Sequence, residues 1–329
     1  MSTLKVDNIR HNSATSDAIT MASDGTCTAK LTNYPHRNLF LNGAVNVSQR
    51  GDSYASGYTY KADQWYIFPT GSTTTRLTTS PPDGFTYYFR FPSTTDSIII
   101  SQQIELDVQG KVGKYKNKTV TVSWYARSES NNTMYVDAAF KNASGGGNYT
   151  SIVAGSGSAQ SITSSWARYS QTFTISATPH ANNTCFSVMI RTPSSGSGST
   201  GTLEATGFQC EFGDTMTDFE HIPFAEEKKR CERYYQTYGF TTLMGSMSGQ
   251  VGTPRILFPT EMRDTPSVTV EYGSNGNGSF RNQNDGSTLT GHTTFNYYTN
   301  GFDCRGNSGS ANIIYSSTYK ADAELRYNT

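Results

Sequence analysis

Short runs that alternate apolar and polar residues recur along most of this 329-residue chain. In V-T-V-S-W-Y-A (120–126) and F-T-I (173–175) the alternation has a period of two, which is typical of a strand with one buried face. About eight runs of this kind, separated by turn-forming residues, predict a jelly-roll β-sandwich over residues 37–222. The predicted strands lie within 37–51, 62–68, 97–108, 118–128, 134–140, 165–175, 184–192 and 201–213.

Two further β regions flank this sandwich. Residues 1–36 alternate only weakly, with a turn at Ser23-Asp24-Gly25, and short strands of this kind need a partner chain or a larger body to pack on. Residues 240–329 predict a second, smaller C-terminal β-sandwich head of about six strands. Within the head, S-N-G-N-G (274–278) indicates a hairpin turn.

Residues 223–239 carry the pattern of a helix. Pro223 suits the first turn, Glu226 and Glu227 follow where the helix dipole favours anions, and Gly239 is suited to ending the helix. The apolar residues of the segment form one narrow stripe, which suits packing against a single neighbour or around an axis. The stripe consists of Phe224, Cys231, Tyr234 and Tyr238. We expect this short junction helix to be the place where three chains meet; the alternative is a plug over one end of the sandwich.

Composition narrows the function classes. Charged residues make up 16% of the chain and aromatic residues 12%, and the formal net charge is zero, so the sequence shows no electrostatic footprint for nucleic acid and is too aromatic for a disordered chain. The five cysteines lack C-x-x-C spacing, which argues against a zinc module and favours buried thiols in a reducing compartment. No signal peptide and no membrane-spanning run is recognisable, so we expect synthesis in a cytoplasm and no membrane insertion.

Two motifs carry a family resemblance. N-L-F-L-N-G-A-V-N-V-S-Q-R-G (38–51) followed by A-D-Q-W-Y (62–66) resembles the start of a domain common in bacteriophage tail fibres. The segment from A-T-G-F-Q-C-E-F-G through D-F-E to C-E-R-Y-Y (205–235) is similar to the closing motif of the same family. The chain's first residues, T-L-K-V-D-N-I, look like the starts of marine-phage fibre or appendage proteins. F-P-T-E-M-R-D-T-P-S-V-T (258–269) and Y-K-A-D-A-E-L (319–325) resemble a C-terminal head domain of such fibres.

The resemblance implies a homotrimeric virion appendage with a jelly roll like a carbohydrate-binding module. It implies that residues 1–36 attach to a virion tail or capsid protein and that the fibre recognises a host surface glycan or receptor. A capsid-attached fibre or decoration protein is an alternative. The family helix usually carries an aliphatic residue before the cysteine, where this chain has Lys228, Lys229 and Arg230, and this departure weakens the apolar seam.

Catalysis and cofactors find little support in the sequence. A glycan-degrading tail spike is a further alternative to a binding fibre; it needs a pair of carboxylates facing one groove, and no spacing marks such a pair. None of the five histidines lies in a metal-binding motif, so we expect no metal and no cofactor.

Sugar binding requires aromatic faces and amide or carboxylate groups for the hydroxyls. The turn-borne Tyr297 and Tyr298 are candidates in the head, because loop tips are where a distal domain meets its target. Trp65 is a weaker candidate, since a tryptophan in a strand more often packs in the core. The full set of candidate ligand-binding residues is Tyr297, Tyr298, Asn275, Asn277, Trp65 and Tyr66.

Overall fold

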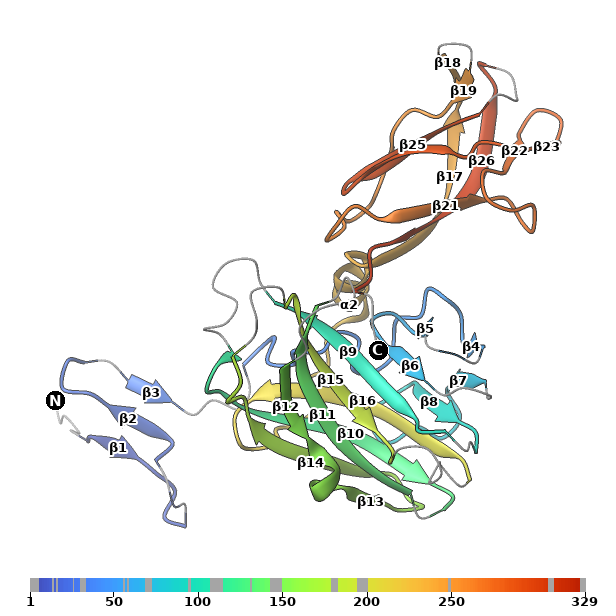
Figure 1. Ribbon diagram of the computed structural model, residues 1–329. Coiled ribbons are helices and arrows are strands. Elements are labelled where there is room, and N and C mark those ends of the chain that lie inside the picture. Colours follow the sequence, from blue (N-terminus) through green and yellow to red (C-terminus); the bar gives the residue numbers. More distant parts are fainter. Residues whose placement is uncertain are drawn as a thin grey trace.

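The regular secondary structure of the described residues consists almost entirely of strands, with the helix α2 (Phe224–Glu232) between two β bodies (Figure 1). This computed structural model describes residues 6–13, 15, 17–25, 27–29, 34–55, 57, 59–68, 73–93, 96–106, 115–130, 132–142, 150–178, 183–193, 201–247, 250–306 and 311–325. The predicted order of jelly-roll sandwich, short junction helix and smaller C-terminal head is confirmed. In the described part of the chain, no helix is both long and apolar enough to span a bilayer.

Two antiparallel sheets form the jelly roll. The β10 sheet has the strand order β14 (Ala167–Thr174), β10 (Thr119–Ser128), β16 (Leu203–Phe212), β8 (Tyr88–Phe91), β7 (Thr74–Leu77) and β4 (Ser53–Tyr54). The β11 sheet has the order β12 (Thr150–Ala154), β11 (Asn132–Lys141), β15 (Cys185–Arg191), β9 (Ile99–Glu105), β6 (Tyr66–Phe68) and β5 (Thr59–Tyr60), and β13 (Gln160–Ile162) also pairs with β11. The 3-10 turn η1 (Gly155–Ser158) follows β12.

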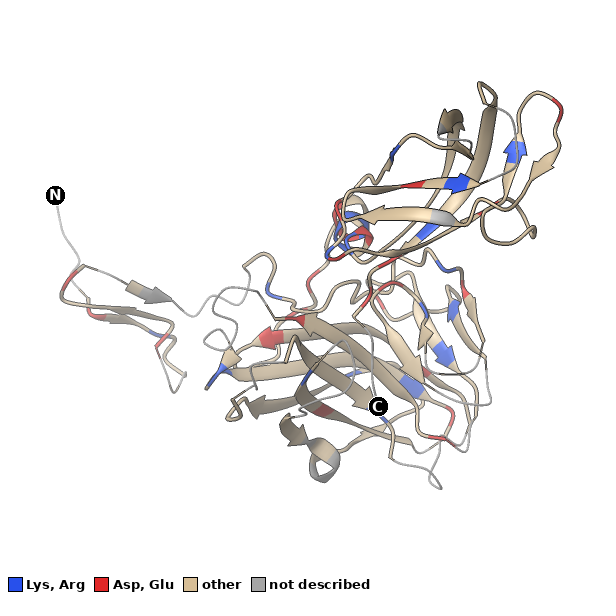
Figure 2. Ribbon diagram, turned by 45° about the horizontal axis from the view of Figure 1, so that its top comes forward, with Lys and Arg blue, Asp and Glu red and all other residues tan. Residues whose placement is uncertain are grey.

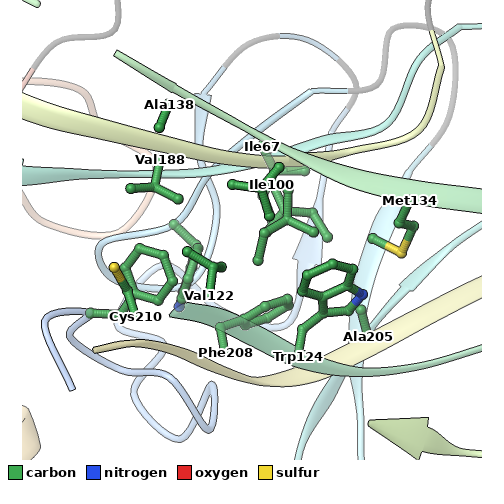
Figure 3. Packing of buried hydrophobic residues seen from close by; sticks show 14 of the residues in the cluster. Ile67, Ile100, Val122, Trp124, Met134, Ala138, Val188, Ala205, Phe208 and Cys210 are labelled. Atoms are coloured by element: carbon green, nitrogen blue, oxygen red, sulfur yellow. The ribbon is translucent and has the colours of Figure 1, made fainter. Parts of the chain in front are cut away.

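The sandwich core lies between these sheets. Figure 3 shows Val122, Trp124 and Phe208 of the β10 sheet facing Ile67, Ile100 and Val188 of the β11 sheet. All six side chains are fully buried. Burying a large apolar side chain stabilises a fold by about 1.5–3 kcal/mol. The alternating runs of the sequence therefore fold as predicted because every second residue enters this core.

The predicted strand within 37–51 is wrong. Residues 37–51 form no strand, and buried asparagine side chains take the place of ladder hydrogen bonds. Asn38 donates to Phe208 O (3.0 Å) and accepts from the backbone of Phe40 and Cys210 (3.0 and 2.9 Å). Asn42 adopts a left-handed φ of 55°, which asparagine tolerates better than most residues. The segment thus wraps across the end of the sandwich.

The helix is shorter than predicted, because it ends at Glu232 and the strand β17 (Tyr235–Leu243) follows. β17 pairs with β26 (Ile314–Asp322) over nine residues, from Tyr235↔Asp322 to Leu243↔Ile314. Tyr, Thr and Phe in this segment suit a strand, and Gly239 lies in the middle of it. A long ladder with a distant strand therefore replaces the last helical turns.

The head consists of two small sheets. In one, the order is β17, β26, β22 (Phe280–Asn282) and β23 (Thr288–Leu289), and β21 (Ser267–Glu271) also pairs with β26. In the other, the order is β18 (Gly245–Met247), β19 (Gln250–Gly252), β25 (Gly301–Gly306) and β20 (Ile256–Leu257), and β24 (Thr294–Tyr298) pairs with β25. The predicted hairpin at 274–278 is only a turn with one isolated bridge, Glu271↔Asn277, because β21 and β22 both pair with the long β26.

The N-terminal arm is a separate three-stranded sheet of β1 (Asn8–Ile9), β2 (Ile19–Met21) and β3 (Cys27–Ala29), and Figure 1 shows it standing away from the sandwich. Its strands are two or three residues long. Ile9 and Met21 are 48% and 38% exposed. A sheet this small does not bury a core of its own.

Candidate functional site

The motif segments 38–51, 62–66 and 205–235 meet where the sandwich, α2 and the head join. Arg50 of the S-Q-R-G motif lies 3.4 Å from Asp63 of the A-D-Q-W motif. Its guanidinium also lies 3.5 Å from Asp322 and 3.3 Å from Glu324, and 3.5 Å from the centre of the Tyr235 ring. Figure 2 shows charged residues gathered around the helix and the adjoining ends of both bodies. We use the name Arg50 cluster for Arg50, Asp63, Tyr235, Asp322 and Glu324.

Neighbouring motif residues complete this junction. Gln49 Nε2 donates to Asp63 Oδ2 and to Tyr235 O, both at 2.7 Å, and so links the sandwich to β17. Asn42 N donates to Glu227 of α2 (2.8 Å), and its amide group donates to Asp63 O (2.9 Å). The motifs therefore perform a structural task, which is to close the sandwich and to fasten the helix and the head to it.

The residues after β26 return to the sandwich. Gln64 Nε2 donates to Glu324 (3.0 Å), and Ala323 N donates to Tyr234 O (2.8 Å). Leu325 is buried against Cys185 and Tyr234. Residues 323–325 therefore form a latch that adds a second connection between head and sandwich beside α2.

Electrostatics at the junction is governed by burial. Desolvation raises the pKa of Glu324 to about 8, and the nearby Arg50 counteracts part of this rise. Burial likewise raises the pKa of Asp63, again opposed by Arg50. Burial thus favours the protonated form of each carboxyl group, and Arg50 favours the ionised form.

The structure does not present the predicted trimer stripe as one surface. Cys231 and Tyr234 are 0% and 7% exposed within a single chain, so their side chains are used inside it. Tyr238 lies on β17 and donates a hydrogen bond to Glu232. Phe224 alone of the four is widely exposed, at 57%. Because the segment turns into a strand after Glu232, the four residues do not form one helical stripe, and the trimer interface stays a prediction.

The predicted ligand residues of the sandwich lie on opposite sides of the β11 sheet. Trp65 is wrong as a ligand platform, because it is fully buried, stands edge-on to Phe40 (ring centres 5.2 Å apart) and donates to Asn42 O (2.8 Å). Tyr66 faces outward, half-buried, with its ring centre 5.3 Å from that of Tyr60.

The predicted ligand residues of the head are not brought together. Tyr297 and Tyr298 are adjacent on β24, so their side chains leave opposite faces of the strand. Tyr297 stacks on Phe295 (5.8 Å), and Tyr298 lies under the Arg255 guanidinium (3.6 Å). Asn275 and Asn277 are exposed, yet both shape their own turn: Asn275 donates to Tyr272 O (2.7 Å) and Asn277 accepts from Val270 N (3.0 Å). These asparagines are explained by turn formation.

A pocket of about 180 Å³ opens on the outer face of the β10 sheet. Its floor is a row of three charged side chains across β8, β16 and β10. Glu204 is 4% exposed and lies 3.1 Å from Arg90 Nε, and it accepts a hydrogen bond from Arg127 Nε. The Arg90 and Arg127 side chains remain 44% and 29% exposed. The buried carboxylate thus orients two arginines whose remaining N–H groups can bind a ligand.

An aromatic face adjoins this pocket. The Arg127 guanidinium lies 4.8 Å from the centre of the Trp166 ring, and Trp166 meets the edge of Tyr88 at 5.5 Å. Trp166 is half-buried and donates to Ser80 O (2.9 Å), which fixes the indole over the sheet. Exposed Glu129 lines the rim and accepts from Thr202 N (3.0 Å). Ser128, Ser164 and Thr202 supply the remaining lining.

A second aromatic group continues along the same face. Phe85 packs against Tyr125 (ring centres 5.1 Å apart), and both rings approach Gly207. A Cβ at Gly207 would meet each ring at 2.7 Å, and its φ of 63° is left-handed. The glycine is therefore required for the rings to lie against the sheet.

The arrangement suits binding rather than acid–base chemistry. Backbone and side-chain hydrogen bonds from Thr202 lower the pKa of Glu129, whereas a general acid needs a raised one. Within the described ranges, no three His, Cys, Asp or Glu side chains are grouped to hold a metal ion. Paired arginines and carboxylates beside an indole are the groups that recognise hydroxyls and apolar sugar faces.

None of the predicted ligand-binding residues lines this pocket. The pocket positions are spread over three strands and their connections, and only the pairings Arg127↔Glu204 and Glu204↔Arg90 align them. The available signal was weak: Arg90 and Arg127 each occupy an outward position in an otherwise apolar or hydroxylated strand, whereas the strand of Glu204 also carries Gln209 and Glu211.

No protein-family profile matches the sequence, and no curated protein matches it. Among solved structures, the chain is similar to the CBM22-1 xylan-binding domain of Paenibacillus barcinonensis, with 11% identity and a TM-score of 0.34, over 54% of this chain and 96% of that one. A CBM61 module solved with β-1,4-galactotriose gives 13% identity and a TM-score of 0.32, over 54% and 99% of the two chains. Tailspike protein 4 of bacteriophage CBA120 gives 14% identity and a TM-score of 0.34, over 55% and 22%. TM-scores this low do not support a conclusion about this chain. The assignment of a jelly roll is based on the strand pairing described above.

Proposed function

We propose that this protein is a structural virion appendage, a tail fibre that recognises a host surface glycan without cleaving it. The observation that carries glycan recognition is the pocket on the β10 sheet, where Glu204 orients Arg90 and Arg127 beside the half-buried Trp166. Each charge-assisted hydrogen bond to a sugar hydroxyl contributes about 1.5–3 kcal/mol. Two or three such bonds give the weak affinity per site that an assembly with several copies can multiply.

The assignment to a virion is supported by the two tail-fibre-like motifs and by the arm. Ile9 and Met21 of the arm are exposed, so its small sheet could bury these side chains by packing against the surface of another protein. We place the attachment to a tail or capsid protein there, within residues 1–36. We also propose a homotrimer, although not through Cys231 and Tyr234, which are buried within one chain.

Glycan binding is tested by titrating the full-length protein on an array of bacterial surface polysaccharides, with Arg90→Met and Trp166→Ala as pocket variants. Each is expected to bind about tenfold more weakly or worse. Tyr297→Ala is the matched control, because it removes an exposed aromatic ring of the head. Loss of binding in Tyr297→Ala alone would move the site to the head, and shortening of the glycan would contradict the non-enzymatic assignment.

Virion placement and assembly need separate measurements. Labelling the protein in intact particles for electron microscopy distinguishes a tail fibre from a capsid decoration protein. Light scattering of the purified full-length chain gives the mass, and a monomer at every concentration would contradict the homotrimer.

A further inference from the structure

We infer that the pocket on the β10 sheet takes one uncharged sugar ring, rather than an acidic sugar or a sulfated one. This inference rests on the proposed glycan binding and adds the class of ligand. Its basis is the balance of charge and the size of the pocket, and each is a property of the described residues.

Charge is balanced within the pocket. Its four ionisable side chains are two arginines, Arg90 and Arg127, and two glutamates, Glu129 and Glu204. Both arginines are already paired with the one buried carboxylate of Glu204. A sugar carboxylate or sulfate would add a third negative charge to four groups whose net charge is already zero. A neutral sugar needs only the free N–H donors and the carboxylate oxygens.

Glu129 strengthens this selection. It lies exposed on the rim, and hydrogen bonds from Thr202 lower its pKa, so it stays ionised across the physiological range. An anionic sugar entering the pocket would have to pass this carboxylate, whereas a hydroxyl can donate to it. Glu129 is thus the specificity-determining group of the site.

Size limits the ligand to one ring. A volume of about 180 Å³ is below the roughly 300–1,000 Å³ of sites for drug-sized ligands. The rest of a longer glycan would lie outside the pocket, over the outer face of the sheet.

The test uses the full-length protein on neutral, carboxylated and sulfated glycans of matched length, at about 50 mM and about 500 mM salt. We expect binding to neutral glycans that changes by less than about twofold between these salt concentrations, since no net charge is neutralised. In Glu129→Gln the pocket gains one net positive charge, and the ratio of carboxylated to neutral glycan binding is expected to rise about fivefold at low salt. Asp214→Asn, an exposed change at the other end of β16, is the control and should leave this ratio unaltered.

The outcomes separate the two proposals. Binding confined to acidic glycans and lost at high salt would overturn the neutral-sugar inference and leave glycan recognition standing. Binding to none of the three classes would overturn both. An unaltered ratio in Glu129→Gln, with the variant folded by circular dichroism, would show that the rim carboxylate does not select the ligand and would also overturn the inference.

Discussion

Arg50→Met is expected to destabilise the protein and to uncouple the head from the sandwich. Methionine keeps most of the side-chain length but removes the cation that lies 3.3–3.5 Å from carboxylates of Asp63, Asp322 and Glu324. The Asp63 side chain is completely buried and that of Glu324 is 3% exposed. Leaving a buried carboxylate without its partner costs about 3–5 kcal/mol. By the same reasoning, the midpoint of thermal unfolding should fall by roughly 6–20 °C.

The loss should depend on pH in a defined direction. Desolvation raises the pKa of Glu324 from 4.5 to about 8 in the folded protein, so the folded state binds a proton that the unfolded state has lost. A raised carboxyl pKa means that the contribution of Glu324 to stability is greatest below about pH 4.5 and declines as pH rises towards 8. Without Arg50 the pKa values of Glu324 and Asp63 rise further. The difference between variant and wild type is therefore expected to shrink on acidification below neutral pH.

Two spectroscopic probes distinguish the bodies in a urea titration. The chain has three tryptophans, Trp65, Trp124 and Trp166, all in the sandwich, so their fluorescence follows that body, whereas circular dichroism follows both. We expect coincident transitions in the wild type and separate ones in Arg50→Met. Arg281→Met, which removes an exposed arginine of the head, should change stability by about 0.5 kcal/mol at most. The reasoning is refuted if Arg50→Met unfolds within about 1 kcal/mol of the wild type with both probes coinciding.

Three further changes test other parts of the structure. Gly207→Ala places a Cβ against two aromatic rings at a left-handed φ and should cost about 1–3 kcal/mol in chemical denaturation, whereas Gly245→Ala, with open space around it, should be nearly neutral. Deleting residues 323–329 removes the latch and should cost about 2–4 kcal/mol and open the junction to limited proteolysis; an unchanged digestion pattern would contradict the latch. Native protein should react with a thiol reagent rapidly at Cys27 alone, since the other four cysteines are buried; prompt reaction of several thiols would contradict this burial.

The sequence was a good guide where the deciding interactions are local. Alternation in 120–126 predicts β10 because each inward side chain enters the same core. It failed where a distant partner decides the outcome. The spacing of Cys231, Tyr234 and Tyr238 predicts that the helix continues past Glu232, yet β26, far along the chain, pairs with the segment from Tyr235. Residues 37–51 look like a strand by composition, but Asn38 and Asn42 satisfy the backbone with side-chain amides instead.

The pocket could not be predicted, for a related reason. Arg90, Arg127 and Glu204 are unremarkable as single residues, and they become neighbours only through the register of three strands. Register depends on turns and bulges, such as the irregularity between Ser123 and Tyr125. The residue types that sequence reasoning favours for sugar binding, exposed tyrosines and turn asparagines, were instead distributed over separate faces and turns of the head.

The motifs and the pocket have different roles in this protein: the motif residues hold the architecture together, and the pocket residues would select the ligand. S-Q-R-G, A-D-Q-W and C-E-R-Y-Y converge on the Arg50 cluster and α2, where they close the sandwich and hold the head. A resemblance carried by these residues is therefore a resemblance of architecture, and it leaves the ligand undetermined. The ligand would be set by Arg90, Arg127, Glu129 and Glu204, none of which belongs to these three motifs. A chain that keeps Arg50 and Asp63 but carries different side chains at the four pocket positions should accordingly keep the fold and bind another glycan.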